Sequence, residues 1–100
     1  MQGVALAQKH LGDRYYSGEG VAQSLERAAH WWKQAAENGN ARAQCNLATC
    51  YYNGSGVEQS EESAIAWWKA AAKQGHSGAQ HSLGQILGEE RAAEWRRRGD

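Results

Sequence analysis

The sequence predicts an all-α protein built from a short tandem repeat of helical hairpins, and three observations support this. First, residues 7–40 and 43–76 are identical at more than half of their positions, and self-similarity at one fixed offset is the signature of a repeat architecture. Second, proline is absent and alanine, glutamine, glutamate and arginine are abundant, which favours helices over strands. Third, apolar residues recur at three-and-four spacing within each unit, and glycines separate the segments.

The first helix of each unit is predicted from a single apolar stripe. In the first unit this stripe is Ala7, Leu11 and Tyr15, which fall on one face of a helix. Gly18 and Gly20 follow, and their conformational freedom is suited to a loop. The same pattern returns 36 residues later in the second unit.

The second helix of each unit is predicted to begin after a serine and to end before a glycine. Ser24 and its counterpart Ser60 are natural N-cap residues. Gly39, like its counterpart in the second unit, is suited to the left-handed position just beyond a helix C-terminus. We expect Asn40 and Ser77 to cap the first helices of the next two units.

Two tryptophan pairs, Trp31–Trp32 and Trp67–Trp68, occupy equivalent positions in the two units. They admit two interpretations, a ligand platform or packing between hairpins. Small residues such as Ala28 and Ala35 let helices approach closely, and the large indole fills the space between one hairpin and the next. We therefore predict that the pairs are used for packing, with the outer indole of each pair partly exposed because its N–H needs a partner.

The third unit departs from the repeat because it lacks the glycine-rich loop. Trp95 and Ala92 match Trp67 and Ala64 at a shorter offset, so about eight residues are missing. We expect a tight hairpin at residues 88–89, the alternative being one bent helix. The arginine-rich end is expected to form a soluble capping face rather than a nucleic-acid site, because no matching basic stripe occurs elsewhere in the sequence.

The stretches ALAQKHLGDRYYSGEGVAQSLERAAHWWKQAAENG and ARAQCNLATCYYNGSGVEQSEESAIAWWKAAAKQG resemble the Sel-one-like repeat, a relative of the tetratricopeptide repeat. The resemblance implies a right-handed α-solenoid of two full helix-turn-helix repeats plus a shortened C-terminal capping repeat. We expect one domain over residues 1–100, with repeats at about 3–38 and 39–74 and a partial repeat at about 75–100. Most members of this family are scaffolds or adaptors, often bacterial, and few are catalytic.

By analogy with tetratricopeptide repeats, the non-core positions of the first helices are expected to line a concave groove. Tyr16 and Tyr52 are the expected anchors, because tyrosine provides a large contact area at low entropic cost. The predicted partner-binding residues of this groove are Lys9, Asp13, Tyr16, Arg42, Cys45, Thr49, Tyr52, His81 and Gln85.

Catalysis and metal binding are two alternative functions of the same surface. Lys9, Cys45 and His81 stand one repeat apart and could form a ladder holding an activated thiol. No third orienting group accompanies them, and the histidines lack the spacing of metal ligands. We therefore expect neither catalytic nor metal-binding residues, and no cofactor.

The predicted function is a protein–protein interaction module that binds a peptide or protein partner in its groove, as a bacterial adaptor or as a small antagonist of one partner. The alternative is a binder of small molecules or cell-wall fragments, or a hydrolase of the repeat family. Balanced charge and the lack of a long apolar run argue against nucleic acid and membrane as partners. Self-association through the end faces is a further alternative.

The two cysteines give information on the cellular compartment in which the protein resides. Cys45 and Cys50 are expected on one helix, too far apart for a disulfide bond. Free thiols and the absence of a visible signal peptide favour a cytoplasmic location.

Overall fold

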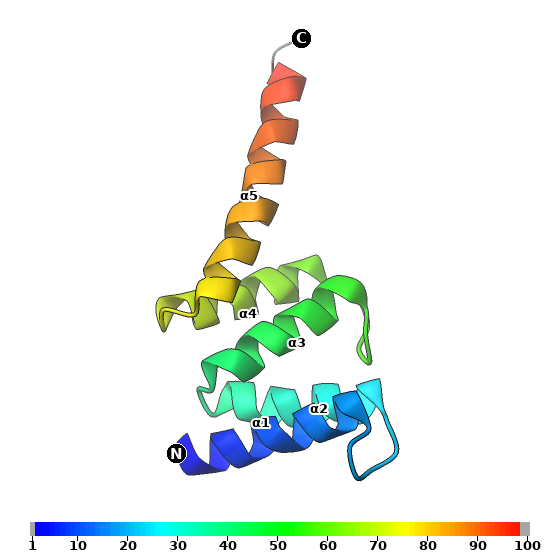
Figure 1. The fold of residues 1–100 in the computed structure, drawn as a ribbon. Coiled ribbons are helices and arrows are strands. Elements are labelled where there is room, and N and C mark those ends of the chain that lie inside the picture. The colour runs from blue at the N-terminus through cyan, green and yellow to red at the C-terminus, as the bar shows by residue number, and fades with distance from the viewer. Residues whose placement is uncertain (1, 99–100) are drawn as a thin grey trace.

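The computed structural model describes residues 2–98, and side chains from Gly3 to Gly88. Within that range all regular secondary structure is helical, and the protein is elongated, measuring 55 × 26 × 16 Å. Two antiparallel helical hairpins are stacked, and a longer helix follows them (Figure 1). The helices are α1 (Gln2–Ser17), α2 (Leu25–Glu37), α3 (Ala41–Asn53), α4 (Glu61–Lys73) and α5 (Ser77–Arg98). The predicted all-α solenoid is confirmed.

Side-chain caps start the helices where the sequence predicted them. Ser24 Oγ accepts a hydrogen bond from the backbone N–H of Arg27 at the start of α2 (3.1 Å). Ser60 Oγ accepts one from Ser63 at the start of α4 (3.2 Å). Each bond satisfies one of the N–H groups that a helix N-terminus otherwise leaves without an acceptor.

The residues that cap α3 and α5 occupy equivalent positions of successive repeats. Asn40 Oδ1 accepts from the N–H of Ala43 (2.8 Å), as predicted. The prediction that Ser77 caps α5 is wrong, because His76 Nδ1 accepts from the N–H of Ala79 (3.1 Å). His76 lies exactly one repeat after Asn40 in the sequence, so the repeat register decides which residue caps the helix, and an imidazole nitrogen can accept as an amide oxygen does.

The loop inside the second hairpin packs against the first hairpin and requires glycine. Gly56 has a φ of 74°, in the left-handed region that favours glycine. A Cβ atom placed on it would also lie 2.3 Å from the carbonyl oxygen of Leu25. Two independent constraints therefore exclude a side chain at this position.

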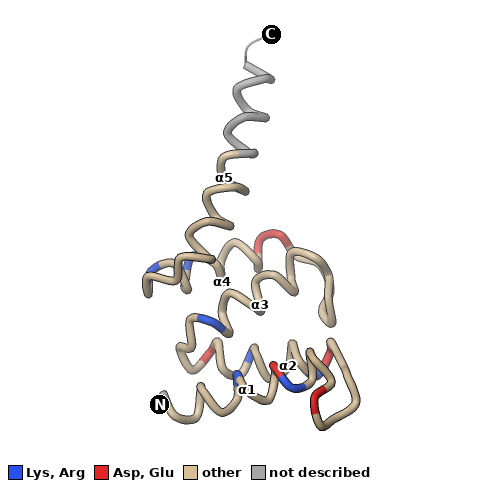
Figure 2. Tube along the Cα trace, in the orientation of Figure 1, with Lys and Arg blue, Asp and Glu red and all other residues tan. Residues whose placement is uncertain are grey.

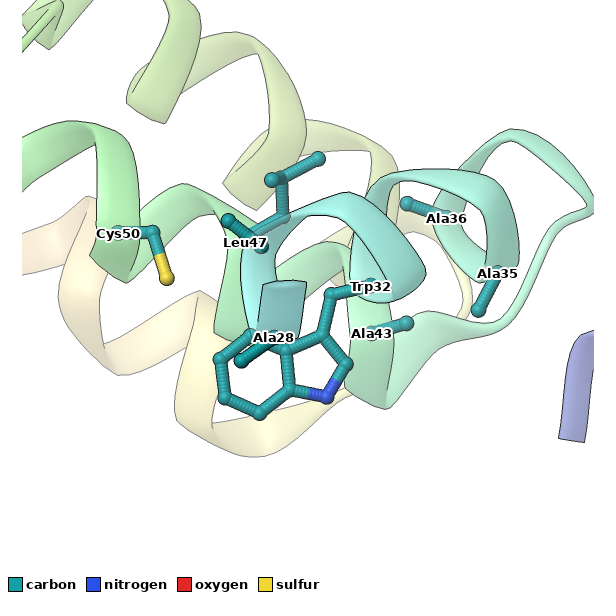
Figure 3. Close-up of a cluster of buried hydrophobic side chains, with 8 residues drawn as sticks. Ala28, Trp32, Ala35, Ala36, Ala43, Leu47 and Cys50 are labelled. Atoms are coloured by element: carbon teal, nitrogen blue, oxygen red, sulfur yellow. The ribbon is translucent and has the colours of Figure 1, made fainter. Parts of the chain in front are cut away.

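The tryptophan pairs are divided between core and periphery. Trp32 and Trp68 are only 5% and 4% exposed, whereas Trp31 and Trp67 are half-buried. Around Trp32, α2 and α3 contribute small residues and one fully buried leucine, Leu47 (Figure 3). The prediction that the pairs serve packing, with the outer indole partly exposed, is confirmed.

The predicted apolar stripe of the first helices meets the preceding hairpin. In α3 it includes Ala43 and Leu47, which belong to the core that contains Trp32. In α5 it includes Ala79, which packs in the core around Trp68. On the equivalent face of α1, Ala7 and Leu11 are exposed, whereas Tyr15 packs against the core that contains Trp32.

The third unit is one continuous helix, α5, and the predicted hairpin at residues 88–89 is wrong. The glycine-rich loop that turns the chain in the first two units is absent, so nothing interrupts the helical hydrogen-bond ladder. A glycine inside a helix costs only about 1 kcal/mol and does not by itself create a turn. The side chain of Trp95 lies outside the residues whose side chains are described. In the described part of the chain, none of the helices combines the length and apolar character needed to cross a membrane.

Charged residues are spread over the helices of both hairpins, with Lys and Arg interspersed among Asp and Glu (Figure 2). The two hairpins therefore contain no long uninterrupted run of Lys and Arg of the kind that would follow a phosphate backbone.

Candidate functional site

One pocket opens at the joint between the two hairpins, and another opens at the joint between the second hairpin and α5. The first, of about 350 Å³, is formed by α1, α2 and α3, and the second, of about 240 Å³, by α3, α4 and α5. The first is lined by Asp13, Tyr16, Trp32, Asn46, Thr49, Cys50, Asn53 and Ser55. The second is lined by Thr49, Tyr52, Trp68, Ser82, Gln85 and Ile86. We call these the first and second joint pockets.

The two joint pockets are the same site repeated. Advancing by one repeat converts the first pocket's Tyr16 and Trp32 into the second pocket's Tyr52 and Trp68. The residues contributed by the next first helix follow the same rule. Thr49 lines both pockets, so the pockets adjoin along α3.

Each pocket has an aromatic floor made from a tyrosine and the inner tryptophan. The ring centroids of Tyr16 and Trp32 are 5.4 Å apart, and those of Tyr52 and Trp68 are 5.6 Å apart, both in tilted arrangements. The tyrosines are 53% and 37% exposed. A rigid aromatic surface held on a buried indole is thus accessible at each joint.

The first pocket contains a satisfied polar network. Asp13 Oδ2 lies 2.7 Å from the ammonium nitrogen of Lys9, and Asp13 Oδ1 accepts a hydrogen bond from Trp32 Nε1 (3.1 Å). A close approach of the indole to α1 makes this possible. A Cβ atom at Gly12 would lie 2.4 Å from Cδ1 of Trp32, so only glycine allows the indole edge to sit against the helix.

The second pocket lacks this network. Ala48 and Thr49 stand where the first repeat has Gly12 and Asp13. The hydroxyl of Thr49 donates to the carbonyl oxygen of Cys45 (3.1 Å). Nε1 of Trp68 is buried and has no hydrogen-bond partner in the described chain.

The thiols do not form an activated centre. Burial raises the pKa of the Cys45 thiol, and the neighbouring Trp68 indole offsets part of that rise. Burial also raises the pKa of Cys50. Both cysteines lie on α3 and are free, and each favours the neutral thiol, which is a poor nucleophile. Among the described residues no group of His, Cys, Asp or Glu has a metal-binding arrangement.

The structure brings together five of the predicted groove residues. Asp13, Tyr16 and Thr49 line the first pocket, and Thr49 also lines the second with Tyr52 and Gln85.

The remaining four predicted residues line neither pocket. Lys9 is only 9% exposed and is paired with Asp13, and Cys45 packs against the core around Trp68. Arg42 and His81 are exposed elsewhere on the first helices.

Sequence reasoning missed the tryptophans as pocket residues, because their regular spacing was assigned to packing alone. It also missed Asn46 and its counterpart Ser82, which lie one repeat apart. Their signal was present in the repeat itself, since any residue lining one joint predicts its counterpart at the next.

Comparison with known proteins gives consistent results. The family model described as Sel1 repeat matches residues 5–40 and 41–76. A comparison with curated proteins finds no match.

Three solved structures are similar to this chain. A protective antigen with an SLR fold, from uropathogenic Escherichia coli strains, is 39% identical with a TM-score of 0.85, over 89% of this chain and 19% of that one. A Sel1 repeat protein from Oxalobacter formigenes is 40% identical with a TM-score of 0.81, over 84% of this chain and 24% of that one. Helicobacter pylori cysteine rich protein B is 26% identical with a TM-score of 0.76, over 79% of this chain and 59% of that one. The chain spans less than two thirds of the length of each.

The repeat architecture of the structure agrees with these comparisons. The family model covers most of the chain in two consecutive matches. The chain therefore belongs to the Sel1 repeat family.

Proposed function

We propose that the two joint pockets together bind a segment of a partner protein, and that the chain is a non-enzymatic interaction module. Sel1 repeat proteins generally mediate protein–protein interactions. The observation that carries the proposal for this chain is the pair of adjoining pockets, each with an exposed tyrosine over a buried tryptophan.

A peptide segment suits this surface for two reasons. Thr49 belongs to both pockets, so the two pockets adjoin and one ligand segment can contact both of them across this residue. The tyrosines offer large, rigid contact areas, which are common anchors in protein recognition because little side-chain entropy is lost on binding. An adaptor and a small antagonist would both use such a groove.

The test compares partner capture by the full chain and by a groove variant. Wild-type protein and the double variant Tyr16→Ala/Tyr52→Ala are immobilised and exposed to a lysate of the source organism, and captured proteins are quantified by mass spectrometry. The matched control is Val21→Ala/Leu25→Ala, which removes two exposed apolar side chains that line neither joint pocket.

We expect the control to recover the same partner as the wild type and the groove variant to lose it. Truncating an anchoring aromatic residue commonly costs about 2 kcal/mol or more of binding free energy, about a thirtyfold loss of affinity. Equal recovery by all three proteins would show that the joint pockets are not the binding surface. Circular dichroism establishes beforehand that each variant keeps its helical content.

A further inference from the structure

The second joint pocket holds a buried hydrogen-bond donor without an acceptor. Trp68 is 4% exposed, and its Nε1 atom has no partner in the described chain. The indole lies beside the Cys45 thiol, but sulfur is only a weak acceptor, and no oxygen or nitrogen atom of the described chain accepts a hydrogen bond from Nε1. Buried polar groups are nearly always paired, so an exception calls for an explanation.

The first joint pocket shows which chemical group satisfies this donor. There the equivalent indole, Trp32, donates to a carboxylate oxygen of Asp13 (3.1 Å). One repeat later the position of Asp13 is taken by Thr49, whose hydroxyl is turned towards the Cys45 carbonyl (3.1 Å). The second pocket therefore retains the donor and has lost its acceptor.

The lining of the second pocket is suited to a carboxylate. Besides Thr49, whose hydroxyl already donates to the Cys45 carbonyl, it contains the hydroxyls of Tyr52 and Ser82 and the amide of Gln85, and none of the lining residues whose side chains the structure describes is acidic. Thr49 and Gln85 are exposed, so the pocket opens to solvent between them. The first pocket has no such preference, because Asp13 would repel a second carboxylate there.

We propose that the second joint pocket takes the side-chain carboxylate of an aspartate in the bound partner segment, with Trp68 Nε1–H donating to it as Trp32 does to Asp13. This inference rests on the proposed function, and it names the chemistry of one residue of the partner. A side chain is the source we assign, because the internal carboxylate at the equivalent place is itself an aspartate side chain.

The test observes the indole N–H directly. In the ¹⁵N-labelled protein the Trp68 indole resonance is assigned from its loss in Trp68→Phe. Three probes are titrated at equal concentrations: N-acetyl-Ala-Asp-Ala-amide, its Asn counterpart, and N-acetyl-Ala-Ala-Ala with a free C-terminal carboxylate.

We expect the Asp peptide to move the Trp68 resonance downfield, towards that of Trp32, and the Asn peptide to leave it in place. No movement with the Asp peptide, or equal movement with the Asn peptide, would overturn the proposal. Movement with the free C-terminus alone would overturn the assignment to a side chain.

Two variants add a matched comparison. Thr49→Asp places a negative charge in the lining, and we expect it to abolish the response to the Asp peptide. Ala66→Asp adds the same charge at an exposed position on α4 that lines neither pocket, and the response should persist. A response that survives Thr49→Asp unchanged would contradict the proposal.

The same variants separate this inference from the proposed function. If both hold, Thr49→Asp weakens capture of the natural partner about tenfold or more, as expected for loss of a charged hydrogen bond. If capture of the partner is lost in Tyr16→Ala/Tyr52→Ala but unchanged in Thr49→Asp, the groove is supported and the carboxylate site is refuted. If the Asp peptide moves the Trp68 resonance but capture of the partner is unchanged in Tyr16→Ala/Tyr52→Ala, the carboxylate site is supported and the groove is refuted as the partner surface.

Discussion

Gly12 and Gly84 offer the same substitution at equivalent positions of the first and third units, in two different surroundings. Both lie inside helices and neither has a positive φ. A Cβ atom at Gly12 would lie 2.4 Å from Cδ1 and 2.5 Å from Nε1 of Trp32. A Cβ atom at Gly84 would have no neighbouring atom within 4 Å.

The expected stability changes follow from two opposing terms. Replacing glycine by alanine within a helix stabilises by about 0.8–1 kcal/mol. At Gly84 nothing opposes this, so Gly84→Ala should stabilise by about that amount. At Gly12 the indole must shift, and overpacking of a filled site costs about 1–3 kcal/mol. The net effect of Gly12→Ala is then a loss of up to about 2 kcal/mol, and the two variants should differ by about 1–3 kcal/mol.

Thermal and urea unfolding monitored by circular dichroism measure both variants. For a domain of this size, 1 kcal/mol corresponds to a change of about 4–8 °C in Tm. Gly84→Ala should therefore melt above the wild type and Gly12→Ala at or below it. If Gly12→Ala raises Tm as much as Gly84→Ala does, the close contact between the Trp32 indole and α1 is refuted.

Two further predictions concern the polar groups at the joints. Asp13→Ala leaves the buried N–H of Trp32 without an acceptor and Lys9 without its ion pair, so urea unfolding should show a loss of about 1–3 kcal/mol; Asp13→Asn, which keeps a carbonyl oxygen, should lose less, and an equal loss would contradict the role of the hydrogen bond. Because burial raises the pKa of Cys45 and of Cys50, both should react with a thiol reagent at pH 7 more slowly than an unstructured cysteine peptide. As the pH rises through the ordinary thiol range, the two thiols ionise in the unfolded protein before they ionise in the folded protein. The stability that comes from keeping them neutral is therefore present below that range and declines above it. Reaction as fast as in the peptide would refute the burial of the thiols.

Local signals were sufficient to predict most of the fold. A serine or asparagine cap accepts a hydrogen bond from a residue three positions later, and a glycine with positive φ is needed within a short loop. Both features can therefore be inferred from residues that are close in the sequence. Ser77 failed as a cap because the repeat register places His76 at the capping position instead. The prediction of a hairpin at residues 88–89 was wrong because helical spacing does not show where a helix begins. The spacing of Ala92 and Trp95 fits a helix face equally well whether that helix begins there or continues from Ser77.

The pocket residues were only partly accessible to sequence reasoning. Periodicity identifies which face of a helix is buried, but it does not show that a buried indole such as Trp32 also lines a pocket. The burial of Lys9 could have been suspected from its four-residue spacing to Asp13, which allows an ion pair along one helix face. The unsatisfied nitrogen of Trp68 depends on side-chain positions across two helices, and no short-range pattern reports it.

Because Thr49 forms a wall common to neighbouring sites, mutations that adapt one site at this residue will also alter the other. A change of specificity through Thr49 must be acceptable to two contacts of the ligand at once, whereas changes at Tyr16 or Gln85 affect one contact each. In a stack of such units, ligand preferences at successive joints would therefore evolve in correlated pairs, and engineering one contact alone should begin at residues that belong to a single joint.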